Sequence, residues 1–220
     1  MIRFCLSAVL LSCAVAAAAE PPTAKTLFDG KTLDGWKAAD FYKAGPVSVK
    51  DGAVVLGKGF RMTGITYDKK DFPTADYEVT LEGKRVDGDD FFATTTFPVG
   101  DQFISLVMGG WGGSTVGLSS INGADASENS TNQSVEFKKN QWYKVRVRVT
   151  EQRVQAWIDA EQVVDLNTKN LKLSIRADCE VSKPFGVSAF KTEAHVRAIT
   201  VRPLTADEVK EAKAPPKAKE

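Results

Sequence analysis

Five carboxylates in two loop-like stretches are the side chains best suited to acid–base or cation chemistry. Asp87, Asp89 and Asp90 stand within four residues of one another, and Asp125 and Glu128 lie in a stretch rich in Ser, Asn, Gly and Asp. A carboxylate can accept or deliver a proton, and it can also ligate a hard cation. Because acidic residues also populate solvated turns, the pattern leaves a purely structural role open.

Four of these carboxylates are assigned roles here. Asp90 and Glu128 are the candidates for proton transfer, and Asp89 and Asp125 are candidates for ligand binding. The run from Asp87 to Asp90 is also a candidate calcium site, because oxygen ligands on a tight turn suit that ion, although the run lacks the ligand spacing of a full calcium loop. No other metal or cofactor is expected.

Two tryptophans and one arginine complete the predicted ligand-binding set. Trp111 stands among four glycines, so its indole either folds back into the core or presents its ring to a ligand such as a sugar. Trp157 either lines a sheet face or is buried between sheets. Arg176 is the basic member of the set.

Four arginines fall on polar positions of predicted strands. We expect them to pair with Glu78 or Glu82 across a solvent-facing surface, since opposite charges on neighbouring strands attract. The four are Arg146, Arg148, Arg176 and Arg197.

The sequence lacks the side chains of several catalytic classes. His195 is the only histidine, which excludes a histidine-rich zinc site and favours a structural role for this residue. Cys179 is the only cysteine after residue 19 and is expected to be a buried, unreactive thiol. There is no Gly-x-Ser-x-Gly elbow, phosphate-binding loop or dinucleotide fingerprint, and the Glu-x-Asp-x-x-Glu strand of retaining glucanases is absent as well.

Alternating apolar and polar residues must supply the frame that positions these groups. Residues 77–82 and 143–150 place an apolar side chain at every second position, as strands with one buried face do. Helical periodicity appears only after Thr205. About a dozen short strands therefore predict an all-β fold, a jelly-roll sandwich of two antiparallel sheets over residues 20–204. Further strands are expected at Phe91–Phe97, Phe103–Met108, Val154–Ile158, Val163–Leu166, Leu171–Ile175, Phe185–Phe190 and Val196–Val201.

Turn signals divide these strands. Lys50-Asp51-Gly52 between two apolar runs predicts a hairpin, and LFDGKTLDGW (Leu27–Trp36) holds two Asp-Gly turns between apolar anchors. Residues 109–113, which read GGWGG, do not suit a strand interior, and residues 119–134 are rich in turn formers. Together they predict a long irregular excursion of the kind that often carries function.

The first 19 residues read as a secretory signal peptide. Arg3 precedes an apolar run and an alanine tract, and the expected cut follows Ala19. Lipidation at Cys13 is a less favoured alternative. No later segment approaches the roughly 20 apolar residues of a transmembrane helix, so we expect a periplasmic or extracellular protein. Residues 205–220 are predicted to form a charged tail, a short frayed helix followed by disorder.

The charge balance bears on the partner. Removing the leader leaves 28 basic against 28 acidic side chains. A neutral surface argues against nucleic acid or an anionic membrane as the main partner and favours a neutral ligand such as a saccharide. The oligomeric state is left open.

Several segments, taken in order, resemble the 3-keto-disaccharide hydrolase domain family, over essentially the whole mature domain. The opening LFDGKTLDGW motif is the most specific of them. The others are VSVKDGAVVLG (47–57), DYEVTL (76–81), WYKVRVRV (142–149), VQAWIDAEQVVD (154–165) and VRAITVRPL (196–204).

The resemblance implies a concanavalin A-like lectin/glucanase fold and an activity on 3-keto-glycosides, which members of this family are associated with cleaving or hydrating. Members typically carry an Asn-Ser-Gly turn and an arginine where residues 87–100 here read DGDDFFATTTFPVG, so the chain is a divergent member. Cleavage by elimination needs a base for the proton at carbon 2, an acid for the leaving oxygen and a group that polarises the ketone. The alternatives are a non-catalytic carbohydrate-binding module and an envelope adhesion domain.

Overall fold

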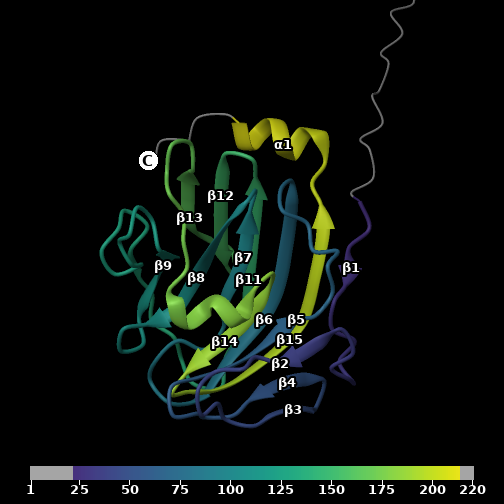
Figure 1. Cartoon of the computed structure of the whole chain (residues 1–220), viewed down its shortest axis with the longest axis vertical. Helices are drawn as coiled ribbons and strands as arrows, with labels where there is room; N and C mark the ends of the chain where they lie inside the picture. The colour runs from purple at the N-terminus through teal and green to yellow at the C-terminus, as the bar shows by residue number, and fades with distance from the viewer. Residues whose placement is uncertain (1–21, 214–220) are drawn as a thin grey trace, which may run out of the picture.

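The computed structural model describes residues 22–213, which form two antiparallel sheets stacked on each other (Figure 1). This architecture confirms the predicted all-β jelly roll. The expected signal peptide and the end of the charged tail lie outside the described residues. Within residues 22–213 no helix is long and apolar enough to cross a membrane.

The described part of the chain has one sheet of eight strands and one of seven. In spatial order the eight-stranded sheet contains β13 (Glu161–Asn167), β12 (Arg153–Ile158), β11 (Trp142–Thr150), β6 (Tyr77–Asp87), β15 (Glu193–Pro203), β4 (Ala53–Leu56) and β3 (Val47–Lys50), with β1 (Lys25–Thr26) paired to β15. The seven-stranded sheet contains β10 (Gln133–Ser134), β9 (Thr115–Ser119), β8 (Gln102–Gly110), β7 (Thr94–Val99), β14 (Gly186–Phe190), β5 (Met62–Tyr67) and β2 (Trp36–Ala38).

Two short helices lie outside the sheets. The 3-10 helix η1 (Ala177–Ser182) crosses in front of the seven-stranded sheet, and the α-helix α1 (Ala206–Lys213) lies at one end of the sandwich (Figure 1). The two helices therefore contact different parts of the sandwich.

The core lies between the sheets because alternate residues of paired strands face inward together. Val79 and Leu81 of β6 lie opposite Val147 and Val145 of β11, and all four are buried. Burying such an aliphatic side chain contributes roughly 2 kcal/mol to folding. Alternation thus fixes which face of each strand is core and which is free for other uses.

The opening motif anchors the N-terminal segment to this core, as its sequence predicts. The Trp36 indole Nε1 donates a hydrogen bond to the Leu27 carbonyl at 2.7 Å and is buried. The Asp29 carboxylate accepts hydrogen bonds from the backbone N–H groups of Lys31 and Thr32, both at 2.8 Å. The hairpin predicted at Asp51-Gly52 joins β3 to β4.

Three expected strands differ from the structure. Strand β7 begins at Thr94 rather than at residue 91, and β8 continues to Gly110 with a register shift after Met108. The segment 171–175 forms no strand. Only Leu173 makes an isolated bridge, because the neighbouring backbone groups bond to the irregular excursion, as in the hydrogen bond from Ser174 N to Ser120 O.

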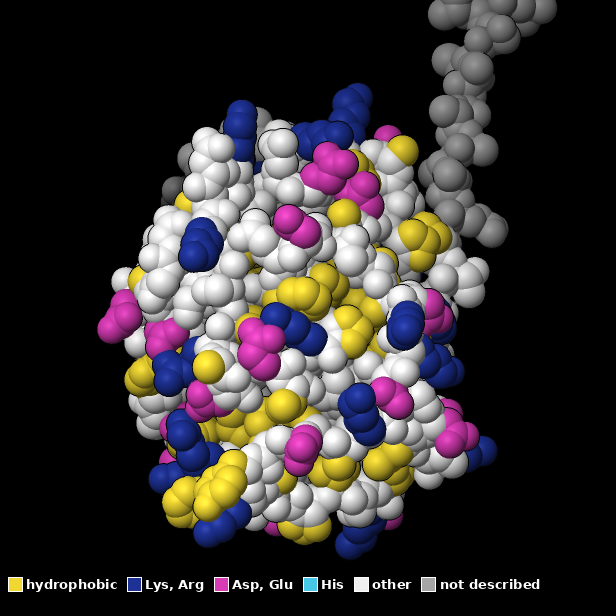
Figure 2. All heavy atoms as spheres, viewed as in Figure 1, with side chains coloured by type: hydrophobic (Ala, Val, Ile, Leu, Met, Phe, Trp, Pro, Cys, Tyr) yellow, Lys and Arg dark blue, Asp and Glu magenta, His cyan; other side chains and the backbone are white. Residues whose placement is uncertain are grey.

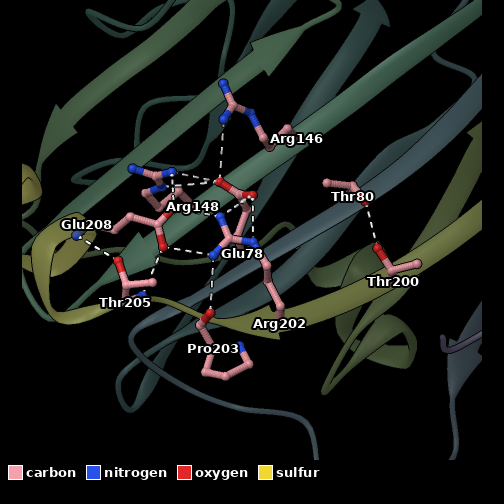
Figure 3. A network of polar contacts seen from close by, with 9 residues as sticks. All are labelled: Glu78, Thr80, Arg146, Arg148, Thr200, Arg202, Pro203, Thr205 and Glu208. Carbon is pink, nitrogen blue, oxygen red and sulfur yellow. Dashed lines mark hydrogen bonds and ion pairs between the residues drawn. The ribbon is translucent and has the colours of Figure 1, made fainter. Parts of the chain in front are cut away.

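The outer face of the eight-stranded sheet carries a dense charge network (Figure 3). The buried Glu78 carboxylate pairs with Arg202 at 2.8 Å, Arg148 at 3.1 Å and Arg146 at 3.6 Å. A buried carboxylate requires such partners, because an unpaired charge there would be strongly destabilising. The predicted pairing of Arg146 and Arg148 with Glu78 is confirmed.

The other two arginines behave differently from each other. Arg197 pairs with Glu82 at 2.7 Å, as predicted. Arg176 pairs with Asp125 instead, because it precedes η1 on the other side of the molecule and does not lie in a strand.

Helix α1 is fixed on this network rather than frayed. Thr205 and Glu208 bond each other reciprocally, from Thr205 N to the Glu208 carboxylate at 2.9 Å and from Glu208 N to Thr205 Oγ1 at 3.2 Å, which is a capping box. Glu208 also pairs with Arg202 at 2.7 Å and Arg148 at 2.9 Å. At its far end, Ala212 is buried.

The first prediction concerns acid stability. The hydrogen bond from Arg202 lowers the pKa of Glu208 from 4.5 to about 2 against the opposing effect of burial. A lowered pKa stabilises the fold above pH 4.5, and this contribution is lost as the pH falls toward 2. Glu208→Gln should therefore reduce the free energy of unfolding by on the order of 2 kcal/mol at pH 7 and by almost nothing near pH 2. Chemical unfolding across this pH range measures both values, and a pH-independent difference would contradict the assignment.

Candidate functional site

A cavity of about 250 Å³ opens on the outer face of the seven-stranded sheet. Residues of β5, β7, β8, β9 and β14 contribute to its floor and walls, and η1 closes one side. Figure 2 shows this side of the molecule, where apolar side chains gather in several places with charged side chains between them. This cavity is the candidate site.

Trp111 lies in the cavity wall and is 46% exposed. Its backbone is left-handed at φ +48°, followed by Gly112 at +89° and Gly113 at +111°, and a hydrogen bond from Gly113 N to Gly110 O closes the turn. Glycine adopts such angles at little cost, which explains the composition of the GGWGG segment. Of the two alternatives for Trp111, the structure has the indole presented at the cavity and not inserted into the core.

Hydroxyl side chains form the polar part of the cavity floor. Thr94, Ser105 and Ser119 line it from three neighbouring strands, since the intervening residues of those strands face the core. Ser105 bonds to Thr96 at 2.8 Å, whereas the buried Thr94 Oγ1 has no hydrogen-bond partner within residues 22–213. An unsatisfied buried hydroxyl is costly, so Thr94 is suited to bond a ligand.

Asp90 brings a carboxylate to the same cavity. One oxygen, Oδ1, accepts a hydrogen bond from Phe91 N at 2.8 Å, and the backbone N–H of Asp90 bonds to Thr192 Oγ1 at 3.3 Å. The second oxygen makes no hydrogen bond or ion pair with the described residues. Asp90 is therefore held in place while one oxygen stays available to a ligand.

Arg176 lines the cavity opposite a fixed counter-charge. Its guanidinium pairs with Asp125, whose carboxylate also accepts hydrogen bonds from Ser120 at 2.7 Å and Ser119 at 3.0 Å. Burial opposes ionisation of Asp125, but these two hydrogen bonds and the Arg176 charge outweigh it and hold its pKa below the usual range. Asp125 thus stays ionised and positions Arg176 rather than transferring protons.

Two further charged or reactive groups line the cavity. Asp178 pairs with Arg61 at 2.8 Å, so this carboxylate is occupied. Burial raises the pKa of the Cys179 thiol to about 11, which keeps it protonated at neutral pH. The structure confirms that this thiol is buried, as expected.

Besides Asp125, which is next to the cavity through its pairing with Arg176 but does not line it, three predicted residues lie away from the cavity. Glu128 is exposed and accepts a long hydrogen bond from Asp125 N at 3.4 Å, which supports the loop. Asp89 is exposed and pairs with Lys139 at 3.4 Å. Trp157 belongs to the eight-stranded sheet, where its ring lies 3.9 Å from the Arg146 guanidinium, and none of the three lines the cavity.

The carboxylates of Asp87 and Asp89, in the Asp87–Asp90 run, have lysine partners. Asp87 pairs with Lys58 at 3.1 Å and with Lys139 at 3.8 Å, so lysine ammonium groups take up its charge. Among residues 22–213 no group of three or more acidic, histidine or cysteine side chains lies close enough to hold a metal ion. Calcium binding stays a prediction that this geometry does not support. His195 lies on the other sheet beside Glu193.

Sequence reasoning missed the aromatic and basic parts of the wall. Phe91 and Phe190 line the cavity with ring centroids 5.6 Å apart, and Arg61 lies 5.9 Å from the Phe190 ring. One signal was present in the sequence. Phe190 lies three residues after the buried Val187 in the same strand. Because side chains alternate between the two faces of a strand, Phe190 must point to the outer face.

Arg85 ties two segments of the cavity from behind. It is 6% exposed, and its guanidinium donates to the carbonyls of Phe137 at 2.9 Å, Gly113 at 3.4 Å and Asp90 at 3.5 Å. Gly113 belongs to the turn that carries Trp111. A buried arginine that bonds backbone carbonyls therefore holds the indole turn and the Asp90 segment in register.

The second prediction tests this tie. Arg85→Met keeps the side-chain bulk and removes the donors, so it should lower the free energy of unfolding by about 2 kcal/mol and speed amide exchange of residues 110–114 about tenfold. Hydrogen-exchange mass spectrometry and chemical unfolding measure these effects. Arg197→Met, on the neighbouring strand β15 of the same sheet and paired with Glu82, is the matched control and should leave exchange at 110–114 unchanged. Unchanged exchange in both variants would rule out the tie.

Solved structures with a similar fold include carbohydrate-related domains at low sequence identity. A carbohydrate-binding module from Bacillus subtilis aligns with a TM-score of 0.53 and 13% identity, covering 76% of this chain and 95% of the module. A putative glycosyl hydrolase from Parabacteroides distasonis aligns with a TM-score of 0.53 and 13% identity, and the alignment covers 83% of this chain and 94% of the hydrolase chain. Domain 4 of the Geobacillus stearothermophilus arabinanase AbnA, solved with arabinotriose, aligns with a TM-score of 0.53 and 14% identity. The alignment covers 88% of this chain and 98% of the domain. These similarities support the fold.

The family assignment comes from the sequence itself. No curated protein matches the chain. A family model for the 3-keto-alpha-glucoside-1,2-lyase-like domain matches residues 23–202, which span nearly all of the described structure. The chain therefore belongs to the 3-keto-alpha-glucoside-1,2-lyase-like domain family.

Proposed function

We propose that this chain is an exported domain that binds a 3-keto-glycoside in the Trp111 cavity and cleaves it by elimination. The observation that carries the proposal is that an exposed indole, a carboxylate with one free oxygen and a fixed guanidinium share one cavity, contributed by Trp111, Asp90 and Arg176. The family assignment supplies the substrate class, and the leader-like first 19 residues support export.

Binding follows from the lining of the cavity. The apolar face of a sugar ring stacks on the Trp111 indole, while the ring hydroxyls bond to groups such as Thr94 and the Arg176 guanidinium. The volume of about 250 Å³ suits a ligand of about one ring. This lining combines apolar contact with a few polar groups, as small-ligand sites do.

The proposed chemistry assigns each step to a side chain of this cavity. Asp90 removes the proton from carbon 2, and the electrons of that C–H bond form an enolate with the neighbouring ketone. Arg176 stabilises the enolate oxygen. The enolate then expels the substituent at carbon 1, forming the C1–C2 double bond, and the departing oxygen takes a proton from water.

A second function is favoured by one specific observation. Two carboxylates among the described residues line the cavity, and of these Asp178 is paired with Arg61, which leaves Asp90 available. Asp125, which does not line the cavity, is paired with Arg176. A cavity with one free carboxylate lacks a separate acid for the leaving group. A carbohydrate-binding module that holds sugar without turnover fits this arrangement.

The third prediction separates the two functions. Asp90→Asn should lower the rate of 3-keto-trehalose cleavage at least about 100-fold, because the amide cannot accept the proton. The dissociation constant of 3-keto-trehalose should change by less than about threefold. Asp89→Asn, at an exposed position paired with Lys139, is the matched control and should keep full activity. Binding without turnover in the unaltered chain would favour the module, and full activity of Asp90→Asn would remove Asp90 from the mechanism.

The fourth prediction concerns the indole. Trp111→Ala should weaken saccharide binding about tenfold or more through loss of the stacking surface, while the melting temperature falls by less than about 2 °C because the ring is not part of the core. Calorimetry and thermal melting measure the two effects. Trp157→Ala removes a tryptophan from the other sheet and should leave binding unchanged. A large loss of stability with unchanged affinity would contradict a ligand-binding Trp111.

A further inference from the structure

Two exposed aromatic side chains form a pair outside the cavity. Tyr42 is 70% exposed and Phe60 is 61% exposed, and their ring centroids lie 6.3 Å apart at an interplanar angle of 84°. The Lys43 ammonium lies 5.3 Å from the Tyr42 ring centroid and 5.7 Å from that of Phe60. Isolated exposed apolar residues need no explanation, but a pair of rings held together on the surface suggests a contact surface.

The loops that carry this pair are fixed to each other. Phe60 N donates to Lys43 O at 3.0 Å, and Gly45 N donates to Thr63 Oγ1 at 2.8 Å. A Cβ at Gly45 would collide with the Gly57 carbonyl, so the backbones touch and only glycine fits there. The rings therefore stand on a preorganised support, which reduces the entropy lost on binding.

The pair is next to a cavity residue in the chain. Phe60 directly precedes Arg61, whose side chain lines the cavity and lies 5.9 Å from the Phe190 ring. Lys191, next to Phe190, donates its backbone N–H to Arg61 O at 2.7 Å. Phe60 therefore directly precedes a residue that lines the cavity and is itself held to the Phe190 strand end.

We propose that Tyr42 and Phe60 form an outer subsite for a second ring of the saccharide whose first ring lies in the Trp111 cavity. This inference rests on the proposed function. A cavity of about 250 Å³ leaves the rest of a two-ring ligand outside, where it reaches the rim at Arg61. The second ring stacks on the exposed aromatics, and the Lys43 ammonium donates hydrogen bonds to its hydroxyl oxygens.

The same surface fits a second copy of the chain less well than it fits a saccharide ring. Each aromatic side chain supplies roughly 200 Å² at most, whereas stable interfaces bury at least about 1,200 Å² in total. Two rings give only a part of that area. A ligand that already occupies the neighbouring cavity needs far less additional contact.

The experiment compares one-ring and two-ring probes in the Asp90→Asn chain, which prevents turnover. Calorimetry with methyl 3-keto-α-glucoside and with 3-keto-trehalose should give about fivefold tighter binding of the two-ring probe. The double variant Tyr42→Ala/Phe60→Ala should abolish this advantage and leave the affinity for the one-ring probe unchanged. Tyr42→Phe, which keeps the ring, is the matched control and should retain it.

The outcomes distinguish this inference from the proposed function. The outer subsite is wrong, and the cavity assignment stands, if the one-ring probe binds and the two-ring probe binds no more tightly. The same holds if the tighter binding of the two-ring probe survives in the double variant. If neither probe binds, both proposals fail. Sedimentation of the unaltered chain and the double variant adds one more outcome: a dimer that dissociates on mutation, with the two-ring advantage intact, would assign the pair to contacts between copies.

Discussion

The alternation of inward and outward side chains along the strands is the constraint on which the rest of this structure depends. Inward residues of both sheets form one core, so the outward residues are released from packing. On the seven-stranded sheet those outward positions hold hydroxyls and aromatic rings beneath η1. On the eight-stranded sheet they hold charges that pair with one another. The same rule therefore produces a cavity on one face and an ionic surface on the other.

Charge pairing then decides which groups in the cavity remain reactive. Asp125 and Asp178 are each committed to an arginine, and Cys179 is kept protonated by burial. Asp90 differs because, among the described residues, its carboxylate accepts one hydrogen bond, from the backbone N–H of Phe91, which fixes its position without neutralising it. Arg176 keeps a defined place because Asp125 holds it. These pairings, as much as the identity of the side chains, decide which charged groups beside the cavity are already paired within the protein.

Much of the frame could be predicted from the sequence, because period-two alternation and Asp-Gly turns are local signals. The two-sheet fold, the Asp51-Gly52 hairpin and the pairing of Arg148 with Glu78 all follow from them. The site is harder, because it assembles from loops whose meeting depends on long-range packing. Asp125 and Arg176 are 51 residues apart, and no local pattern indicates that they pair. Leu171–Ile175 failed as a strand for the same reason, since its backbone partners lie in the distant excursion.

The attachment of α1 has a consequence beyond stability. The helix contributes Glu208 to a surface where Glu78 alone faces three arginines. Protonation of Glu208 would free the helix and leave this end of the sheet with excess positive charge. In strongly acidic surroundings the molecule would then attract polyanions on the side opposite its cavity.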